Sequence, residues 1–395
     1  MGIFQKLKDV IIKISVVEKL KQFHPWIYKD EIKKFPKNIN KGDLVKVSSP
    51  YGEILGIGYI NPESIITVRI LAFKNEEVNK EFFQKRIYKA FIYRQKIFDN
   101  ITDAYRIIHS EADFIPGLIV DKYADYLSIQ FNTAGINRFR NLIIKSLIEI
   151  IKPKGIYEKV DEKISKIEDL SQNKEQTIYG NVPDKIHVIE NSLKFIASIK
   201  QGQKTGLFLD QRKNRKIVSS YTQRGFKILD LFSNSGGFGI YCLKKRVDFV
   251  EFVDVSQVAI SQIKENCKLN NFKNYKAIKE DAFDYLNNLN KKFNLIIIDP
   301  PAFAKTRKEK DGAIKGFQFL IINSIKALEE NGYIAVFSCS HHITEEDLKK
   351  VFLFASQKTG KKIVIIEKLI QDLDHPYLLN SPPSFYLKGF LIKVI

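Results

Sequence analysis

The sequence predicts an α/β protein in three parts: a small β-barrel module, a middle α+β domain and a C-terminal doubly wound domain. Three observations predict it. After residue 195 short apolar runs alternate regularly with helical segments, as in a parallel sheet covered on both faces. Between residues 24 and 73 turn signals such as Ser49-Pro50-Tyr51-Gly52 separate short β-like runs. The stretch between them mixes strands and helices in another order.

We expect residues 1–22 to form a short amphipathic extension, because Lys alternates there with Ile and Val at helical spacing and no signal-peptide pattern is present. Residues 23–75 form the β module, residues 76–195 a linker helix with the middle domain, and residues 196–395 the doubly wound domain. Within the middle domain we expect helices over 76–100 and 137–151, strands near 105–110, 118–121, 127–131 and 156–159, and a loop-rich stretch over 161–184. In the C-terminal domain the expected strands are 227–232, 249–254, 275–279, 295–299, 333–337, 362–367 and 386–394.

Composition restricts the class of protein. The 395 residues are 44% apolar and 28% charged, which is ordinary for a globular protein and argues against disorder. The longest apolar runs fall short of the roughly 18 to 20 residues that a membrane-spanning helix needs. Three cysteines without a C-x-x-C pair argue against a disulfide framework and against a zinc site. We therefore expect a cytoplasmic protein without a membrane anchor or a metal.

The net charge of +19 favours a polyanionic partner, because Lys and Arg neutralise phosphates and release counterions. Nucleic acid is the leading candidate. A generally lysine-rich, solvated surface would give the same charge. Charge alone does not decide between the two, and the sequence leaves open whether the protein is a monomer or a homodimer.

A cofactor-binding site is predicted where the first strand of the C-terminal domain ends. Asp230 lies near the end of that strand, and Ser233, Gly236 and Gly237 form a small-residue loop before a helix that starts near Phe238. Such a loop places backbone N–H groups at the carboxyl edge of the sheet. Its residues 233–239 read SNSGGFG rather than G-x-G-x-x-G, which favours S-adenosylmethionine over a dinucleotide.

Two further acids close the next two strands. Asp254 can accept both ribose hydroxyls of the cofactor, and Asp281 can bind an adenine amino group. For any single acid a helix N-cap is an equally good explanation. Three acids at three successive strand ends make that explanation weaker for the set.

The reacting groups are expected at the fourth and fifth strands. Asp299, followed by Pro300 and Pro301, ends the fourth strand, and Cys339 ends the fifth, 40 residues later. If these strands are parallel neighbours, a carboxylate and a thiol project from the same edge. A thiolate that attacks C6 of a pyrimidine makes C5 nucleophilic enough to be methylated. Cys242 and Cys267, by contrast, lie on apolar helical faces, and we expect them to be buried.

Other residues near these motifs have a possible functional role, and some of them also have a purely structural explanation. Pro300 is assigned to the methyl-donor pocket, and Pro301 and Phe303 to the substrate, with Phe303 stacking on a flipped base. The alternative for Phe303 is a ring packed inside a tight turn. His341 and His342 are candidates for proton handling, although such histidines are more often surface residues.

Six motifs carry a family resemblance: His24-Pro25-Trp26-Ile27, residues 206–212 (GLFLDQR), Asp299-Pro300-Pro301, residues 337–340 (FSCS), Asp374-His375-Pro376 and residues 386–390 (YLKGF). The run from Lys204-Thr205 to Arg215 is the most distinctive. From about His24 to the C-terminus the chain resembles the PUA-containing class I methyltransferases that make 5-methylcytosine in large-subunit ribosomal RNA, the ribosomal large-subunit methyltransferase I family.

The resemblance implies a PUA-like N-terminal module, a Rossmann-like methyltransferase domain, S-adenosylmethionine as cofactor and RNA as partner, bound by the PUA-like and middle domains. It implies that Cys339 is the attacking thiolate and that Asp299 contacts the target base. Asp230, Gly236, Asp254 and Asp281 would line the methyl-donor pocket, and Phe208 and Asp210 would close it. Ala302 stands where related cytosine enzymes often carry a second cysteine, so the base that removes the C5 proton is not identified.

Four alternatives stay open. Uridine C5 methylation uses a similar cysteine, but that cysteine tends to be followed by Asn-Pro rather than Ser340-His341. Exocyclic-amine methylation would use the Asp299 motif alone and leave Cys339 structural. A non-catalytic RNA-binding assembly factor would need neither the thiol nor all the acids. A nicotinamide dehydrogenase is disfavoured by the glycine spacing.

Overall fold

The structure is a computed structural model that describes residues 7–98, 101–200, 206–381 and 384–395. Its chain contacts divide it into two compact units, which are described in turn. Unit 1 comprises Met1–Ile189, Ala197–Leu207 and Leu373–Phe385. Unit 2 comprises Glu190–Ile196, Phe208–Asp372 and Tyr386–Ile395. The predicted boundary at residue 196 therefore does not coincide with the units, because residues 197–207 and 373–385 pack with unit 1.

The N-terminal module of unit 1 is a six-stranded sheet in the order β2-β6-β5-β4-β1-β3. β1 pairs in parallel with β4, and Val10 and Ile12 on β1 are completely buried. The prediction of an extension over residues 1–22 is therefore wrong for its described part, because alternate residues of β1 enter the core as in a strand. The elements are β1 (Lys8–Ile12), α1 (Ile14–Lys21), β2 (Trp26–Tyr28), β3 (Ile32–Lys34), β4 (Leu44–Ser48), β5 (Ile54–Ile60) and β6 (Ile66–Ala72).

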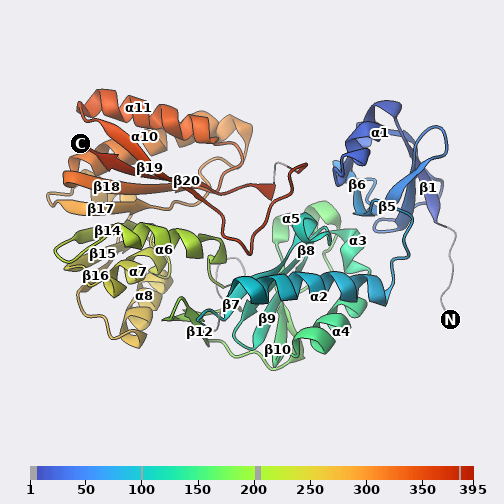
Figure 1. The fold of residues 1–395 in the computed structure, drawn as a ribbon, viewed down its shortest axis with the longest axis horizontal. Coiled ribbons are helices and arrows are strands. Elements are labelled where there is room, and N and C mark those ends of the chain that lie inside the picture. The colour runs from blue at the N-terminus through green and yellow to red at the C-terminus, as the bar shows by residue number, and fades with distance from the viewer. Residues whose placement is uncertain (1–6, 99–100, 201–205, 382–383) are drawn as a thin grey trace. The chain divides into compact units, whose positions relative to one another are not determined.

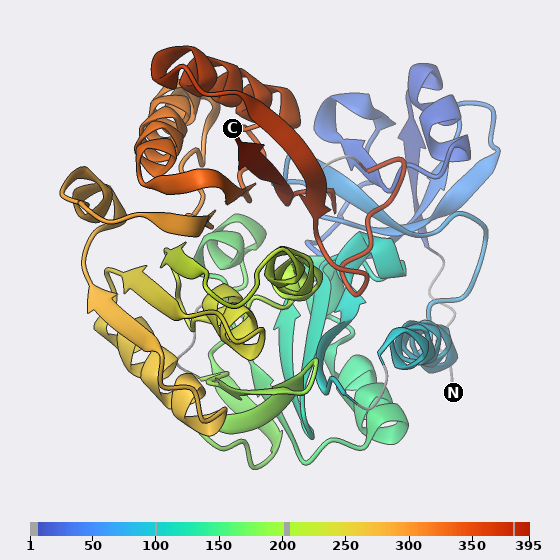
Figure 2. The ribbon, with the colours of Figure 1, turned by 60° about the vertical axis from the view of Figure 1, so that its left-hand side comes forward.

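The middle domain is a five-stranded sheet in the order β11-β10-β9-β8-β7, with two long helices side by side on it (Figures 1 and 2). The predicted helices and strands up to residue 159 are found. The loop-rich prediction for residues 161–184 is wrong, because a helix capped by Asp161 and an edge strand form there. The elements are α2 (Lys80–Ile97), β7 (Ala104–His109), β8 (Leu118–Tyr123), β9 (Tyr126–Phe131), α3 (Ala134–Asn137), α4 (Arg140–Ile151), β10 (Gly155–Glu158), α5 (Glu162–Glu168) and β11 (Gln176–Gly180). A two-stranded sheet of β12 (Ile186–Glu190) and β13 (Leu193–Ala197) follows, and its residues Glu190–Ile196 belong to unit 2.

Buried polar contacts join these two domains within unit 1. The Tyr59 hydroxyl donates to the carbonyl of Pro116 at 2.7 Å, and Asn61 Nδ2 donates to Glu168 at 2.8 Å. Buried hydrogen bonds of this kind are costly to break. The predicted β module and middle domain therefore form one structural unit.

Unit 2 is a seven-stranded sheet in the order β16-β15-β14-β17-β18-β20-β19, which confirms the predicted doubly wound α/β class (Figure 1). One expectation needs correction: the sheet is mixed, since β20 pairs antiparallel with both β18 and β19. The reason is connectivity, because a parallel neighbour requires a crossover, whereas β20 returns beside β19. The strands are β14 (Lys227–Leu231), β15 (Phe249–Asp254), β16 (Tyr275–Lys279), β17 (Phe293–Ile298), β18 (Leu328–Ser338), β19 (Ile363–Ile370) and β20 (Lys388–Val394).

Helices cover both faces of this sheet (Figures 1 and 2). Leu229 and Leu231 of β14 belong to the core that includes the apolar residues of α9, α10 and α11. Strand alternation turns Asp230 to the opposite face, where α7 packs on β14 and β15. The helices are α6 (Arg212–Ser220), α7 (Gly237–Lys244), α8 (Gln257–Leu269), α9 (Ala282–Asn287), α10 (Lys310–Lys326) and α11 (Glu345–Thr359).

The strand order fixes where a ligand can bind. The chain steps from β14 to β15 on one side and later to β17 on the other, so the order reverses at β14. Open α/β sheets bind ligands outside the carboxyl ends of their strands at such a reversal. Within the part of the chain that the structure describes, no helix has both the length and the apolar character needed to cross a membrane.

Candidate active site

The loop between β14 and α7 has the geometry of a ligand cradle. Gly236 adopts a left-handed conformation (φ +80°) as the N-cap of α7. A Cβ on Gly237 would lie 2.6 Å from Nε of Arg215, so a larger residue would displace that guanidinium. The Gly236 N–H donates to the carbonyl of Ser233 at 2.7 Å, which closes the turn. The loop therefore presents the first turn of α7 to the carboxyl edge of the sheet.

Asp230 and Asp254 hold this loop from both sides. Asp230 Oδ2 accepts the Gly239 N–H at 2.9 Å. Asp254 Oδ2 accepts the Asn234 N–H at 2.9 Å, and its Oδ1 accepts the Ser256 N–H at 2.8 Å. A carboxylate oxygen can accept more than one hydrogen bond. Asp254 can therefore fix the loop and still accept hydroxyl groups from a ligand.

The electrostatics of this edge favour a cationic ligand. Burial raises the pKa of Asp230 well above its usual range, and the carboxylates of Asp299 and Asp254 add to that rise. The Gly239 N–H and the Arg215 guanidinium oppose it. Asp254 and Asp299, at the ends of β15 and β17, thus act on Asp230 near the end of β14. A positive ligand among them would relieve their repulsion.

Asp281 has the contacts of a helix cap. Its Oδ1 accepts the Phe283 N–H at 2.8 Å at the start of α9, and its side chain is exposed. These contacts match the N-cap alternative. A contact with an adenine amino group stays a prediction for Asp281.

Asp299 and Cys339 lie at the ends of neighbouring strands, as predicted. β17 pairs in parallel with β18, with Ile298 opposite Val336. Gln211 Nε2 donates to Asp299 Oδ1 at 3.1 Å, and Gln211 itself is almost fully buried. Sequence reasoning missed Gln211, whose only signal is its place in the GLFLDQR run.

The loop that carries Cys339 is tied to the proline turn. Ser340 Oγ donates to the carbonyl of Ala304, three residues after Pro301. Cys339 is partly exposed, whereas Cys242 and Cys267 are completely buried, as predicted. Cys339 is therefore a partly exposed residue just beyond the end of β18, the strand next to the one that ends at the Asp299 motif.

The other predicted substrate residues differ in exposure. Pro300 is buried and Pro301 is exposed. The Phe303 ring packs against other aromatic rings, with centroids 6.2 Å from Phe232 and 5.2 Å from Phe317. These contacts favour the packing alternative over stacking on a base.

Phe208 and Asp210, which are predicted to close the methyl-donor pocket, lie on the segment before α6. Arg215 donates to the carbonyl of Phe208 at 2.5 Å. Asp210 is 4% exposed, and its Oδ2 accepts the Tyr386 hydroxyl at 2.7 Å. The Gly206 to Arg212 and Tyr386 to Phe390 motifs thus meet at Asp210. Lys204 and Thr205 lie outside the described residues.

Lys388 is a second residue that sequence reasoning missed as a site residue. It is 6% exposed, and its Nζ donates to the carbonyl of Ser340 at 2.6 Å. A signal was present, because Lys388 opens a strand that is otherwise almost entirely apolar. Only the pairing of β20 with β18 places it beside the Cys339 loop.

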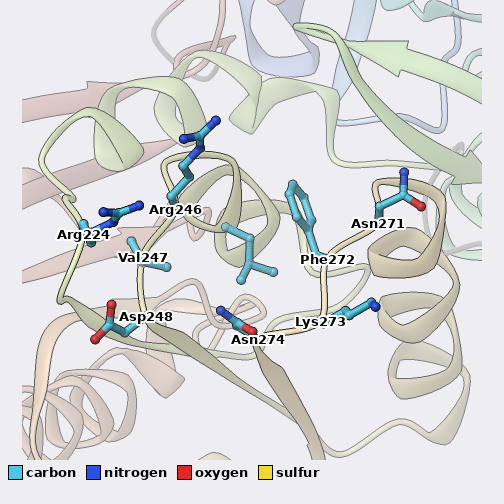
Figure 3. Close-up of a pocket in the computed structure, with 9 residues that line it drawn as sticks. Arg224, Arg246, Val247, Asp248, Asn271, Phe272, Lys273 and Asn274 are labelled. Carbon is cyan, nitrogen blue, oxygen red and sulfur yellow. The ribbon is translucent and has the colours of Figure 1, made fainter.

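Two surface hollows of unit 2 lie elsewhere. One of about 650 Å³ is lined by the segments that precede β14, β15 and β16, including Arg224, Arg246 and Lys273 (Figure 3). The other, of about 780 Å³, shares Lys273 and lies along β16. The first lies at the amino ends of these strands and the second along β16, so neither is the predicted cofactor-binding site.

Comparisons with known proteins agree with this fold. Residues 10–73 match the family model described as PUA-like domain, and residues 214–368 match the model described as Conserved hypothetical protein 95. Among solved structures, that of SMU.776 complexed with SAH has a TM-score of 0.85 at 22% identity, covering 98% of this chain and 100% of that one. Trm5b from Pyrococcus abyssi has a TM-score of 0.53 at 18% identity, covering 70% and 74%. These likenesses show the fold.

Sequence relatives show the family. The chain is 35% identical over 379 residues to "Ribosomal RNA large subunit methyltransferase I" of Pseudoalteromonas atlantica, covering 94% of this chain and 95% of that protein. It is 34% identical over 381 residues to the protein of the same name from Tolumonas auensis, covering 94% and 96%. The predicted resemblance is confirmed, and the chain belongs to the ribosomal RNA large subunit methyltransferase I family.

Proposed function

We propose that this protein is an S-adenosylmethionine-dependent methyltransferase that forms 5-methylcytosine in large-subunit ribosomal RNA. The names of its relatives support methylation of ribosomal RNA. One observation carries the choice of chemistry: the partly exposed Cys339 follows β18, and its neighbour Ser340 is bonded to the loop that follows Asp299-Pro300-Pro301. A nucleophile and a carboxyl thus border one end of the sheet.

The residues at the ends of β14 and β15 fit the methyl donor. S-adenosylmethionine carries an ammonium and a sulfonium, and it supplies an electrophilic methyl group when bound. Asp230 and Asp254 offer carboxylates in the environment described above, where a cation is favoured. Gly236 and Gly237 keep the loop free of side chains. Asp254 would accept the ribose hydroxyls, and Phe208 and Asp210 would close the pocket.

Cys339 opens the reaction as a thiolate. Its sulfur forms a bond to C6 of the cytosine, and the electrons of the C5–C6 double bond shift toward C4 and N3, where a proton is taken up. Asp299 lies beside the base and holds the proton at N3. C5 has become the nucleophilic carbon of an enamine and takes the methyl group. A base then removes the C5 proton, the C5–C6 double bond re-forms as the thiolate leaves, and the proton on N3 returns to the Asp299 carboxylate.

RNA binding is assigned to unit 1 and to the basic charge of the whole chain. The PUA-like module and the middle domain share buried hydrogen bonds, so they would engage RNA as one body. The net charge of +19 supplies the sequence-independent attraction to phosphates. Binding should weaken steeply with rising salt.

An RNA fragment that contains 5-fluorocytosine tests the mechanism. Fluorine cannot leave C5 as a proton does, so the enzyme should remain covalently joined to the RNA after methyl transfer. We expect an adduct on a denaturing gel that requires S-adenosylmethionine and disappears with Cys339→Ser. The control is the same RNA with ordinary cytosine.

Each alternative predicts a different result. An adduct with 5-fluorouracil RNA alone would assign the reaction to uridine. Methylation that persists in Cys339→Ala would assign it to an exocyclic amine. Absence of S-adenosylmethionine binding in calorimetry would favour a non-catalytic RNA-binding factor.

A further inference from the structure

Lys388 contacts the cysteine loop from a strand that lies far away in the sequence. It is the first residue of β20 and pairs with Ser338, the last residue of β18. Its Nζ donates to the carbonyl of Ser340 at 2.6 Å. A buried lysine thus holds both ends of the three-residue segment that has Cys339 at its centre.

The charge of Lys388 acts on this segment. Burial lowers the pKa of the Lys388 ammonium, and the negative charges of Cys339 and Glu345 raise it. The pKa of His341 is lowered by burial and then by the charges of Lys388 and His342. The electrostatic partners of Lys388 are therefore the thiolate form of Cys339 and one glutamate.

The acidic residues at the start of α11 are already paired with other lysines. At the start of α11, Glu345 pairs with Lys368 at 2.7 Å, and Asp347 pairs with Lys310 at 2.8 Å. Glu346, on the same turn, pairs with Lys349 at 2.6 Å. Among the described residues no carboxylate lies within ion-pair distance of Lys388 Nζ. Its positive charge is therefore available to the thiol, while the three acids that would oppose a thiolate are offset.

We infer that Lys388 is the positioning residue that activates Cys339: its ammonium stabilises the thiolate, and its hydrogen bond to Ser340 fixes the loop that presents it. A thiolate, not a thiol, is the nucleophile that adds to a pyrimidine ring. The inference deepens the proposed function and rests on it for the role of Cys339 in methyl transfer. The ionisation of the thiol can be measured without RNA or methyl donor.

The experiment is the pH dependence of iodoacetamide alkylation, followed by mass spectrometry of the native protein. Cys242 and Cys267 are completely buried, so the label reports Cys339. In Lys388→Met we expect the alkylation midpoint to rise by about one pH unit, which lowers the thiolate fraction about tenfold below that midpoint. Lys388→Arg keeps the charge and should stay close to the wild type. Lys393→Met on the same strand is the matched control and should change nothing.

Thermal unfolding of each variant shows whether the fold is retained. An unchanged midpoint in folded Lys388→Met would overturn the inference, as would an equal rise in Lys388→Arg, because both would show that the charge does not act on the thiol. If Lys388→Met does not fold, the comparison of Lys388→Arg with Lys388→Gln decides the same question. A shifted midpoint in a protein that fails to methylate RNA would leave this inference standing and refute the proposed function.

Discussion

Gly239→Ala tests how the fold builds the methyl-donor site. Gly239 is the third residue of α7, where this helix lies against β15. A Cβ there would lie 2.2 Å from Cε1 of Phe252 and 2.8 Å from a methyl carbon of Val250. Carbon atoms in contact are normally about 3.5 to 4.0 Å apart, so α7 or the ring must move by more than about 1 Å.

The expected cost follows from two opposing effects. Overpacking of a buried site typically costs about 1 to 3 kcal/mol. Replacing a helical glycine with alanine returns about 0.5 to 1 kcal/mol. Gly312 is the matched control, because it is also the third residue of a helix, α10, and nothing lies within 4 Å of its added Cβ. The difference between the two variants isolates the overpacking cost.

Two assays check the prediction. In urea unfolding, Gly312→Ala should be slightly more stable than the wild type and Gly239→Ala less stable. In calorimetry, Gly239→Ala should bind S-adenosylmethionine about tenfold or more weakly, because the helix shift breaks the 2.9 Å bond from its N–H to Asp230. A Gly239→Ala protein as stable as Gly312→Ala, with unchanged affinity, would refute the packing argument.

Three further predictions concern single side chains. Arg215→Met leaves the buried Glu190 carboxylate without the guanidinium that lies 2.6 Å away, so the free energy of unfolding in urea should fall by about 3 to 5 kcal/mol. Adding Glu190→Gln should recover part of that loss. A loss below about 1 kcal/mol in Arg215→Met would contradict this prediction. Burial and, next, the charge of Arg106 lower the pKa of His109 well below 6.5. As the pH falls, this histidine is therefore protonated in the unfolded chain before it is protonated in the folded protein. The free energy of unfolding should fall below pH 6.5, by up to about 1.4 kcal/mol per pH unit. His109→Gln should flatten that slope in unfolding curves taken from pH 7 to pH 5. Thr344→Ala removes the hydroxyl that accepts the Asp347 N–H at the start of α11. It should lower the free energy of unfolding in urea by about 1 kcal/mol. No change would show that water replaces this cap.

Much of unit 2 could be predicted because its signals are local. Most of its strands contain a short apolar run, and the residues at their ends, Asp254 or Asp299-Pro300-Pro301 for example, stop the strand whatever its neighbours are. Strand β1 was missed because its local signal is ambiguous. Between Lys8 and Lys21 a strand and a helix adjoin, and the mixture of Lys with Ile and Val satisfies both periods. Only the pairing of β1 with β4 decides between them.

By itself the sequence determined the family, the alternation of strands and helices in unit 2, and the placing of Asp299 and Cys339 at two strand ends, because these depend on residues close together in the chain. The tertiary structure decided which distant residues complete the site. Gln211 reaches Asp299 across 88 residues, and Lys388 reaches Ser340 across 48. Those contacts arise from the segment before α6 and from an antiparallel strand, β20. No local pattern encodes them, because a hydrogen bond between distant segments exists only once the sheet has brought both partners together.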